Sequence, residues 1–409
     1  MGTRGFWLWL AGIVVLGAAL RVAHALLVAP WPPTFFNDEA YYSALAELIS
    51  RGEGFVRPGE FFGEGLSVPT AERAPLFPLA LAALAELGVT GGDGRLLGVL
   101  TGGGTIVVVA LLARRLAGDR AGLLAAGLAA VYPTLIAADG ALMTESLYGL
   151  LCGLSLLAAY RVLEKPALGR ALVLGAIVGV AAHARAEALL LLPLLVVPLI
   201  RQPGGLRATA VICLSFAVVL APWTVRNWAA FDRPVLVATE GGETLAGANC
   251  AATYFGESIG AWSVSCVRFS GHGNEAAELH EEGREGIRYA LDHLDRVPAV
   301  AAARLARTWG LWWPVQRPEG RAAWVTYIGA ALLFVLAPLA IYGFMLLRRR
   351  RVPVWILTTP FITVTLTTLL AYGSARFRHS AELPLVVLAA VALDQLLRRN
   401  AVRREPGPS

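Results

Sequence analysis

The sequence predicts an all-helical protein that crosses a membrane several times. Of its 409 residues, 56% are hydrophobic and only 16% are charged, whereas a soluble domain carries about 25% charged residues. Apolar stretches of roughly 20 residues, the length that crosses the hydrocarbon core as a helix, recur along the chain. Because short polar connections separate most of these stretches, we interpret the chain as a bundle of spanning helices.

Ten segments have the hydropathy expected of membrane-spanning helices. We place them at residues 6–29, 95–116, 121–138, 141–160, 168–184, 186–200, 207–223, 322–347, 352–372 and 382–397. The first continues past Arg21 and His24 to Ala29, so we interpret it as a retained helix and not as a cleavable signal peptide. The apolar stretch 75–87 has about 13 residues, too few to cross comfortably. We expect it to lie in, or dip into, the outer interface.

The basic residues support this topology. With ten spans and Arg4 inside, five basic clusters face the cytoplasm, as the positive-inside rule expects. The clusters are Arg114 with Arg115, Arg161 with Lys165, Arg201 with Arg207, residues 348–351, and Arg398 with Arg399. Counting 75–87 as a further span would divide these clusters between the two sides. Both termini are therefore expected in the cytoplasm, and residues 30–94 and 224–321 are expected to form two long outer loops.

The type of basic residue and the positions of the cysteines add to the interpretation of the sequence. Almost all of the basic charge is arginine, since Lys165 is the only lysine, and we interpret this as a compositional bias and not as a nucleic-acid interface. Cys152 and Cys213 lie within apolar spans, whereas Cys250 and Cys266 share the second outer loop. If that loop faces an oxidising compartment, we expect the latter two to form a disulfide.

Acidic residues gather at the predicted outer surface. Asp38 and Glu39 are adjacent carboxylates at the start of a helical pattern that ends at Gly52. A local interpretation explains them as well: Asn37 or Asp38 could cap the helix, with Glu39 as a first-turn acid. Glu145 enters the fourth predicted span near the same face, where ionisable residues are costly and often functional; its alternative role is to pair with an arginine.

Six arginines fall at outer helix ends, against the bias that places arginine inside. They are Arg73, Arg95, Arg185, Arg226, Arg376 and Arg378. The planar guanidinium donates two parallel hydrogen bonds to a phosphate, so a lipid phosphate at the outer interface accounts for the set. For any single one, snorkelling toward anionic headgroups is an equal explanation.

Seven short motifs, in this order, resemble the GT-C superfamily of membrane glycosyltransferases, especially the branch of protein O-mannosyltransferases and lipid A aminoarabinose transferases. They are Asp38-Glu39-Ala40-Tyr41-Tyr42, Arg73-Ala74-Pro75-Leu76-Phe77-Pro78, Arg95-Leu96-Leu97, Thr144-Glu145, His183-Ala184-Arg185-Ala186-Glu187, Pro222-Trp223-Thr224-Val225-Arg226-Asn227 and Arg376-Phe377-Arg378. The resemblance implies a GT-C fold with a seven-helix catalytic module at 1–223, which includes the loop 30–94. A small extracytoplasmic domain at 224–321, further spanning helices at 322–397 and a cytoplasmic tail at 398–409 follow.

The same resemblance implies an inverting transfer of a sugar from a polyprenyl-phosphate donor at the outer face of a bacterial cytoplasmic membrane. Asp38 is similar in position to the catalytic base, and Glu39 and Glu145 are further candidates. The arginines expected to bind the donor phosphate are Arg95, Arg376, Arg378, Arg73 and Arg185. No cofactor is predicted, and because nothing resembles the metal-binding aspartate motifs of oligosaccharyltransferases, no metal ligand is assigned. The acceptor, whether protein, lipid or glycan, stays open.

Other functions remain compatible with these residues. A transporter or lipid flippase could use the same arginines for an anionic headgroup, although polar residues along the midplane and inverted repeats would then be expected. A noncatalytic scaffold would tolerate substitution of Asp38. A polymerase or ligase with a diphosphate-linked donor would share much of the architecture.

Overall fold

The computed structural model describes residues 3–28, 37–268, 273–312 and 323–404. In these residues the secondary structure is helical apart from one isolated bridge between Val56 and Pro69. Six helices are long and apolar enough to cross a membrane: α1 (Thr3–Leu27), α5 (Leu96–Ala117), α8 (Glu145–Glu164), α11 (Gly205–Phe231), α16 (Ala323–Arg349) and α18 (His379–Arg404). The protein is therefore an all-helical, multi-pass membrane protein, as predicted.

Four predicted spans differ from a full-length crossing helix. The segment 121–138 is broken into α6 (Asp119–Val131) and α7 (Pro133–Asp139), which are bent by 62°. Tyr132 takes an extended conformation between them, because the ring of a following proline disfavours the helical region. The other three are shorter apolar helices, α9 (Leu168–Ala184), α10 (Ala188–Ile200) and α17 (Trp355–Leu370). With the bent pair counted once, the described residues contain up to seven helices that are long and apolar enough to cross a membrane, and the count of ten stays a prediction.

The short apolar stretch near residue 80 forms α4 (Leu76–Ala85), which has 10 residues. It contacts α9 and α2 (Asp38–Ser50), the helix that begins with the two adjacent acids. The Tyr42 and Phe77 rings join α2 to α4, with centroids 5.1 Å apart. The start of α2 is thus fixed against the apolar bundle.

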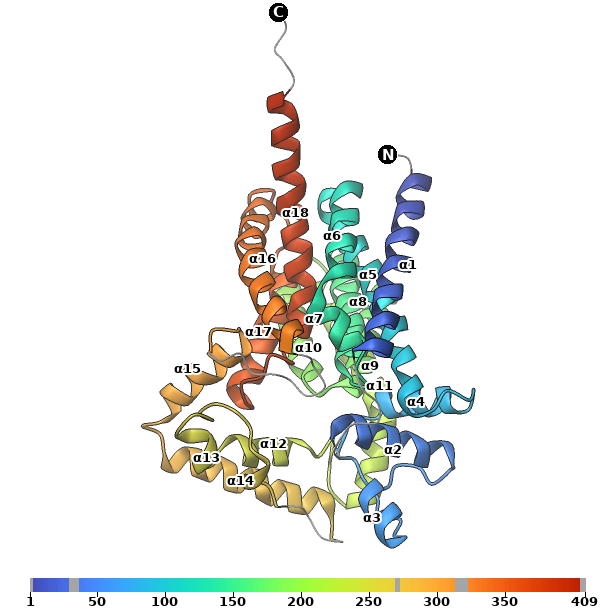
Figure 1. Ribbon diagram of the computed structural model, residues 1–409, viewed down its shortest axis with the longest axis vertical. Helices are drawn as coiled ribbons and strands as arrows, with labels where there is room; N and C mark the ends of the chain where they lie inside the picture. Colours follow the sequence, from blue (N-terminus) through green and yellow to red (C-terminus); the bar gives the residue numbers. More distant parts are fainter. Residues whose placement is uncertain (1–2, 29–36, 269–272, 313–322, 405–409) are drawn as a thin grey trace, which may run out of the picture.

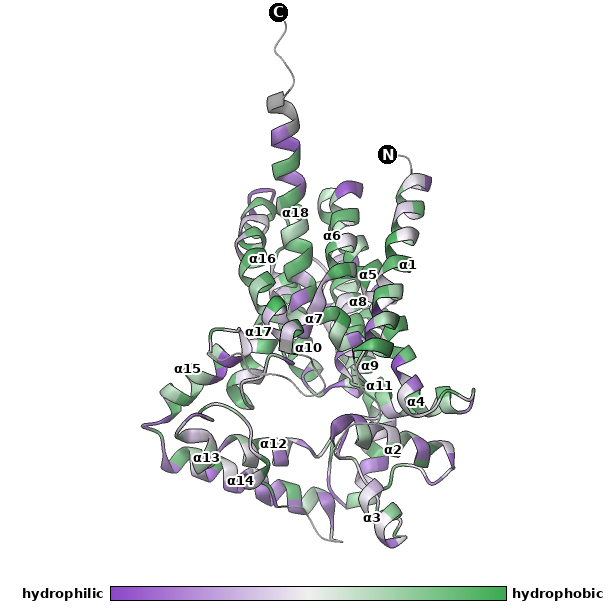
Figure 2. Ribbon diagram, in the orientation of Figure 1, coloured by the Kyte–Doolittle hydropathy of each residue, from purple (hydrophilic) through white to green (hydrophobic). Residues whose placement is uncertain are grey.

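The long loops and the chain ends lie at opposite ends of the bundle. In Figure 1 both termini project from one end, and α2 and α3 (Pro58–Glu64) lie at the other. The same end carries the remaining outer helices, α12 (Gly241–Ala248), α13 (Ala251–Tyr254), α14 (Glu275–Asp292) and α15 (Val297–Thr308). Hydrophobic residues dominate the bundle, whereas hydrophilic ones are frequent in this outer layer (Figure 2).

An arginine that forms a buried ion pair also satisfies backbone groups at the break between α6 and α7. Arg21 of α1 is fully buried, and its Nε lies 2.6 Å from Asp139 Oδ2. The same guanidinium donates to the carbonyls of Ala129 and Ala130, which have no intrahelical partner because α6 ends at Val131. Inside a bilayer every freed backbone group needs an internal partner, and Arg21 supplies it.

The two long outer segments are joined at one buried carboxylate. Glu275 of α14 accepts hydrogen bonds from Thr70 Oγ1 at 2.7 Å, from the Ala71 amide at 2.8 Å and from Thr239 Oγ1 at 2.7 Å. Arg57 Nε donates to it at 3.2 Å. Residues near position 70, which precede Arg73, are therefore anchored to the second outer segment.

The disulfide predicted from the sequence is present. Cys250 and Cys266 are bonded in the second outer segment, while Cys152 and Cys213 are free. The bridge closes the loop that contains α13 and so ties together a part of the chain with little apolar core of its own.

Candidate active site

Asp38 is the first residue of α2 and is not used to cap it. The cap is Asn37, whose side chain accepts a hydrogen bond from the Ala40 amide at 3.1 Å. The Asp38 carboxylate is about one-quarter exposed and faces two arginines. The local capping role proposed for this motif therefore belongs to Asn37, and Asp38 is left available for another role.

Two arginines from distant parts of the chain hold Asp38. Arg73 Nη2 lies 3.1 Å from Oδ1, and Arg376 Nη1 lies 3.0 Å from Oδ2. Burial by itself raises the pKa of Asp38, but the two guanidinium groups outweigh it, and the net effect lowers the pKa below its usual value. Asp38 is consequently ionised at neutral pH, the form in which a carboxylate can accept a proton.

Arg376 also reaches the second predicted acid. Its Nε donates to Glu145 Oε1 at 2.7 Å, at the N-terminus of α8. Arg185 Nη1 approaches the same oxygen at 3.4 Å and is held by Glu187, with Nη2 and Oε1 2.7 Å apart. Asp38, Glu145, Arg73, Arg185 and Arg376 thus form one continuous group.

Glu39 points away from that group. It is buried and accepts a hydrogen bond from the Leu142 amide at 3.0 Å. That amide lies in the turn between α7 and α8, so Glu39 attaches the start of α2 to the start of the helix that carries Glu145. Its contact sets the relative position of Asp38 and Glu145.

Two of the five predicted phosphate-binding arginines lie outside the group. Arg378 Nε donates to Glu382 Oε1 at 2.8 Å, and the other oxygen of Glu382 accepts from Thr134. Arg95 Nη1 donates to the Ala25 carbonyl at 3.3 Å. These hydrogen bonds join segments of the helical bundle and do not involve Asp38 or Glu145.

Two further residues of the sequence motifs have structural contacts. Arg226 donates to the carbonyls of Thr70 and Phe55 at 2.8 and 2.9 Å. His183 Nε2 lies 3.0 Å from the Val219 carbonyl oxygen and joins α9 to α11. Arg226 therefore supports the segment that leads to Arg73, and His183 supports the helix packing.

Two carboxylates that the sequence did not single out contact Arg73. Glu240 Oε2 lies 2.7 Å from Nη1, and Glu72 Oε1 lies 3.4 Å from Nη2. Burial raises the pKa of Glu72 to about 7, a rise that Arg73 partly opposes. Glu240 precedes α12 in the outer segment and has no motif around it, so only the folded chain brings it to Arg73. Glu72 was visible beside Arg73 in the sequence.

The acidic groups do not form a metal-ligand set. Among the described ranges, no three histidine, cysteine, aspartate or glutamate side chains are grouped so that they could hold a metal ion. Asp38 and Glu145 instead face the same guanidinium. The arrangement is thus two carboxylates that share one guanidinium group.

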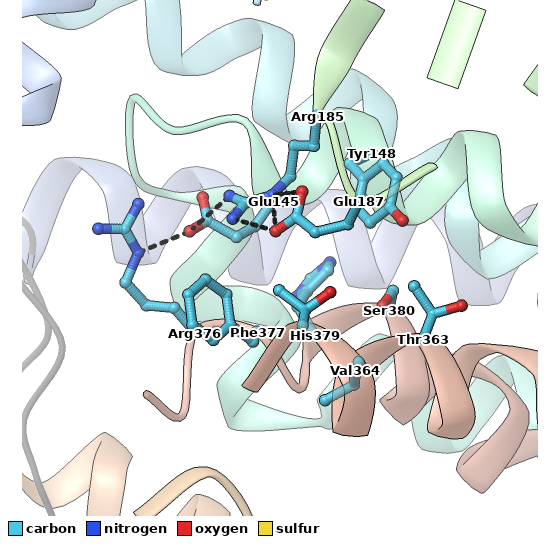
Figure 3. A pocket seen from close by; sticks show the side chains of 11 residues that line it. Glu145, Tyr148, Arg185, Glu187, Thr363, Val364, Arg376, Phe377, His379 and Ser380 are labelled. Carbon is cyan, nitrogen blue, oxygen red and sulfur yellow. Dashed lines mark hydrogen bonds and ion pairs between the residues drawn. The ribbon is translucent and has the colours of Figure 1, made fainter. Parts of the chain in front are cut away.

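A small pocket opens next to Glu145 and Arg376. In Figure 3, Glu145, Arg185, Glu187 and Tyr148 lie on one side, and Phe377 and His379 lie on the other with residues of α17. Its lining comes from α8, from the connection between α9 and α10, from α17, from the loop between α17 and α18 and from the beginning of α18. The pocket and Asp38 therefore share Arg376.

Comparison with known proteins shows a match to a family model and a shared fold. Residues 72–228 match the family model described as dolichyl-phosphate-mannose-protein mannosyltransferase. The apo oligosaccharyltransferase of Archaeoglobus fulgidus superposes with a TM-score of 0.58 at 14% identity, over 97% of this chain and 51% of that one. The chain has the GT-C fold. It spans about half the length of that archaeal enzyme.

Two other GT-C structures carry a lipid phosphate. The Archaeoglobus fulgidus oligosaccharyltransferase AglB in complex with an inhibitory peptide and a dolichol-phosphate has a TM-score of 0.55 at 14% identity, over 98% of this chain and 52% of that one. ArnT from Cupriavidus metallidurans bound to undecaprenyl phosphate has a TM-score of 0.43 at 15% identity, over 98% and 80%. No curated protein matches the chain in sequence.

The segment that matches the family model covers only part of the site. Arg73, Glu145 and Arg185 lie inside residues 72–228, whereas Asp38 precedes that segment and Arg376 follows it. The three-dimensional structure, and not the matched segment alone, therefore brings Asp38 and Arg376 to the other three residues.

Proposed function

We propose that this protein transfers a sugar from a polyprenyl-phosphate donor to an acceptor at the extracytoplasmic face of a bacterial cytoplasmic membrane. The observation that carries the proposal is the position of Asp38, an ionised carboxylate at 3.0 and 3.1 Å from Arg376 and Arg73. A general base beside cations that can receive a departing phosphate is what a sugar transfer from a lipid phosphate requires.

The distribution of arginine supports an outer location for the site. The end of the bundle that carries the termini also carries the last turns of α5 and α16, with Arg114, Arg115, Arg348 and Arg349. Basic residues favour the cytoplasmic side. The end that holds Asp38 is then extracytoplasmic, where the disulfide between Cys250 and Cys266 would also be stable.

The proposed reaction is a single displacement. Asp38 takes the proton of an acceptor hydroxyl while the hydroxyl oxygen forms a bond to the anomeric carbon. The bond between that carbon and the phosphate oxygen breaks, its electron pair stays on the phosphate, and polyprenyl phosphate leaves with an added negative charge. Attack opposite the leaving group inverts the anomeric configuration.

In this reaction Arg376 links proton transfer to Asp38 with the departure of the phosphate. In the structure Arg376 is shared between Asp38 and Glu145, so it neutralises two acids before a donor arrives. When its donors turn toward the departing phosphate, Asp38 loses a cation that holds its pKa down and becomes a stronger base. The increase in charge on the leaving group and the proton affinity of Asp38 are therefore coupled.

The other site residues have supporting roles in this proposal. Glu145 orients Arg376 and Arg185, and Glu39 fixes the start of α2 through the Leu142 amide. Arg73 and Arg185 complete the positive side of the site, each already paired with a carboxylate. The donor phosphate must compete with those carboxylates for the guanidinium groups.

The test compares the wild type with Asp38→Asn in nanodiscs that contain undecaprenyl-phosphate-linked mannose, glucose or galactose and a membrane extract as the source of acceptors. Because a positioned base contributes about 10² to 10⁴ in rate, we expect the variant to lose at least about 100-fold in release of undecaprenyl phosphate. Glu47→Gln, on the same helix and exposed, is the control and should react like the wild type.

Three outcomes are distinguishable. Loss of release in Asp38→Asn alone, with unchanged thermal unfolding, supports the transferase. Equal release by both proteins contradicts Asp38 as the base. If labelled donor moves between leaflets without any sugar transfer, the protein is a lipid transporter and the proposed reaction is wrong.

A further inference from the structure

The loop between α17 and α18, which carries Arg376, is hydrogen-bonded to the second outer segment. The Gly373 amide donates to the Gly260 carbonyl at 2.8 Å, and the Ser374 amide donates to Thr308 Oγ1 at 3.1 Å. The Ser374 hydroxyl in turn accepts from the Arg376 amide at 3.3 Å. The backbone that leads into Arg376 is therefore fixed by a part of the chain that is distant in sequence.

The backbones at this contact meet without room for a side chain between them. A β-carbon at Gly373 would lie 2.5 Å from the carbonyl oxygen of Arg304 in α15, and one at Gly260 would lie 2.7 Å from the Arg304 amide nitrogen. Gly260 also has a φ of 76°, in the left-handed region where glycine is favoured. Both glycines therefore allow the loop with Arg376, the loop with Gly260 and α15 to pack directly against one another.

Two arginines of α15 join this helix to the segments on either side. Arg304 Nη1 donates to the Leu369 carbonyl near the end of α17 at 2.8 Å, and its Nη2 donates to the Ala248 carbonyl at the end of α12 at 2.7 Å. The last carbonyls of a helix have no partner within the helix, so Arg304 satisfies two helix ends at once. Arg307 Nε donates to the Ile259 carbonyl at 2.7 Å. In Figure 1, α15 lies beside α17, and these bonds fix it there.

Gly260 lies in the loop that the disulfide between Cys250 and Cys266 closes, here called the disulfide loop. The helical elements of this loop are short, since α13 has four residues and the turn that ends at Cys266 has three. A cross-link between the ends of an irregular loop restricts the conformations that the loop can take. The bridge therefore limits how far Gly260 can move away from Gly373.

We propose that the disulfide loop and α15 position Arg376, so that the bridge between Cys250 and Cys266 supports binding of the donor phosphate. Gly260 and Thr308 are positioning residues, because they act on Arg376 through the backbone of its loop. The role of Arg376 in phosphate binding rests on the proposed function, whereas the contact between the outer segment and the loop does not. Since a disulfide persists in an oxidising compartment, the site is expected to be complete after the outer segment has reached such a compartment.

Two kinds of variant loosen the proposed contacts. Cys250→Ser combined with Cys266→Ser opens the bridge, and Thr308→Val removes the hydroxyl that accepts from the Ser374 amide. Thr308→Ser keeps that hydroxyl and serves as the rescue. The control for the loss of two cysteines uses the free pair, Cys152→Ala with Cys213→Ala.

The first measurement is amide hydrogen exchange in residues 371–378 of the full-length protein in nanodiscs, without any lipid phosphate. Each loosening variant weakens about one neutral hydrogen bond, so we expect exchange there to become about three- to tenfold faster. Thr308→Ser and the free-cysteine control should exchange like the wild type. Exchange in α8 should be unchanged in every variant, which shows that the bundle is folded.

The second measurement is the affinity for undecaprenyl phosphate, with and without Arg376→Ala. A hydrogen bond from a charged donor contributes more than a neutral one, so Arg376→Ala should weaken binding about 10- to 100-fold. The loosening variants should weaken binding about three- to tenfold when Arg376 is present. They should have no further effect in Arg376→Ala, because no guanidinium is left to position. A merely structural role would weaken binding in both backgrounds.

The inference is overturned if exchange in residues 371–378 is the same in the loosening variants as in the control. It is also overturned if these variants lower the affinity equally with and without Arg376, or if they leave it unchanged while Arg376→Ala lowers it. Failure of the proposed function gives a different pattern, in which the wild type does not bind undecaprenyl phosphate or Arg376→Ala binds it equally well. In that case faster exchange still supports positioning of the loop, and unchanged exchange overturns it.

Discussion

Arg376 contacts both acids of the site, Asp38 and Glu145. Its Nη1 donates to Asp38 and its Nε donates to Glu145. A guanidinium can do this because its donors are fixed in a plane and point in more than one direction, whereas an ammonium group is a single point of charge. In the proposed reaction, an anion that draws Arg376 away from Asp38 removes a cation that lowers the pKa of Asp38.

Glu72 also contacts an arginine of the site, so its competition with a donor phosphate for Arg73 is expected to depend on pH. Burial raises its pKa to about 7, and its carboxylate lies 3.4 Å from Arg73. Above pH 7 Glu72 is ionised and competes with a donor phosphate for Arg73, whereas below pH 7 it is neutral and does not. We therefore predict that Glu72→Gln tightens donor binding several-fold at pH 8 and has little effect at pH 6.

The measurement for Glu72 is the affinity for undecaprenyl phosphate across this range in the full-length protein. Glu53→Gln is the control, since Glu53 is exposed in the same outer segment. A variant that follows the wild-type pH profile at every point would show that Glu72 does not control Arg73.

At the scale of the elements, three connections bring the site together. The first turn of α2 carries Asp38, the segment between α3 and α4 carries Arg73, and the loop between α17 and α18 carries Arg376. None of these is a long helix with its own packing face. The position of Arg73 depends on the hydrogen bonds of Glu275 with Thr70, Ala71 and Thr239. The start of α2 is held instead by packing against α4 and by the contact of Glu39 with the Leu142 amide.

We predict that Glu275→Ala loosens the outer layer more than the bundle. The substitution leaves two threonine hydroxyls and a backbone amide without their acceptor, at a cost of at least about 3 kcal/mol. The expected result is faster proteolysis between α11 and α15 and weaker donor binding through displacement of Arg73, while the far-ultraviolet circular dichroism stays near that of the wild type.

Glu278→Gln provides the comparison, because Glu278 is on the same helix but partly exposed, with Arg57 at 3.9 Å. Such a contact contributes little, so its proteolysis should match that of the wild type. Equal resistance of Glu275→Ala and Glu278→Gln would contradict the role assigned to the buried carboxylate.

At the scale of the whole molecule, the two ends of the helical bundle differ in amino-acid composition and in the elements that they carry. One end holds the termini and the arginine-rich helix ends, and the other holds the outer helices, the disulfide and the site. This asymmetry is what orients a membrane protein, since basic residues are retained on the cytoplasmic side.

The predicted orientation can be measured with single cysteines. In a protein whose Cys152 and Cys213 are replaced by alanine and whose disulfide is kept, Ser67→Cys and Asn400→Cys place an exposed thiol at opposite ends. A maleimide that cannot cross membranes should label Ser67→Cys in intact spheroplasts and label Asn400→Cys only after lysis. The opposite pattern would place the site in the cytoplasm.

The sequence by itself determined the helical class, the six long apolar helices, the short helix near residue 80 and the candidates Asp38 and Glu145. Each depends on hydropathy, length or a motif, which are local properties. It did not foresee the break at Tyr132, although the following proline is a signal for one. Nor did it show that Arg378, which directly precedes α18, pairs with Glu382 four positions later.

Only the tertiary structure decided which charges meet. Asp38 and Arg376 are separated by 338 positions, and Glu240 comes to Arg73 from an outer segment without a recognisable motif. The energy of such pairs depends on distance and on burial, and neither can be read from the order of residues. The hydropathy of the chain determines that it enters a membrane as helices, whereas the site exists because the fold places charges from five distant segments within hydrogen-bond range.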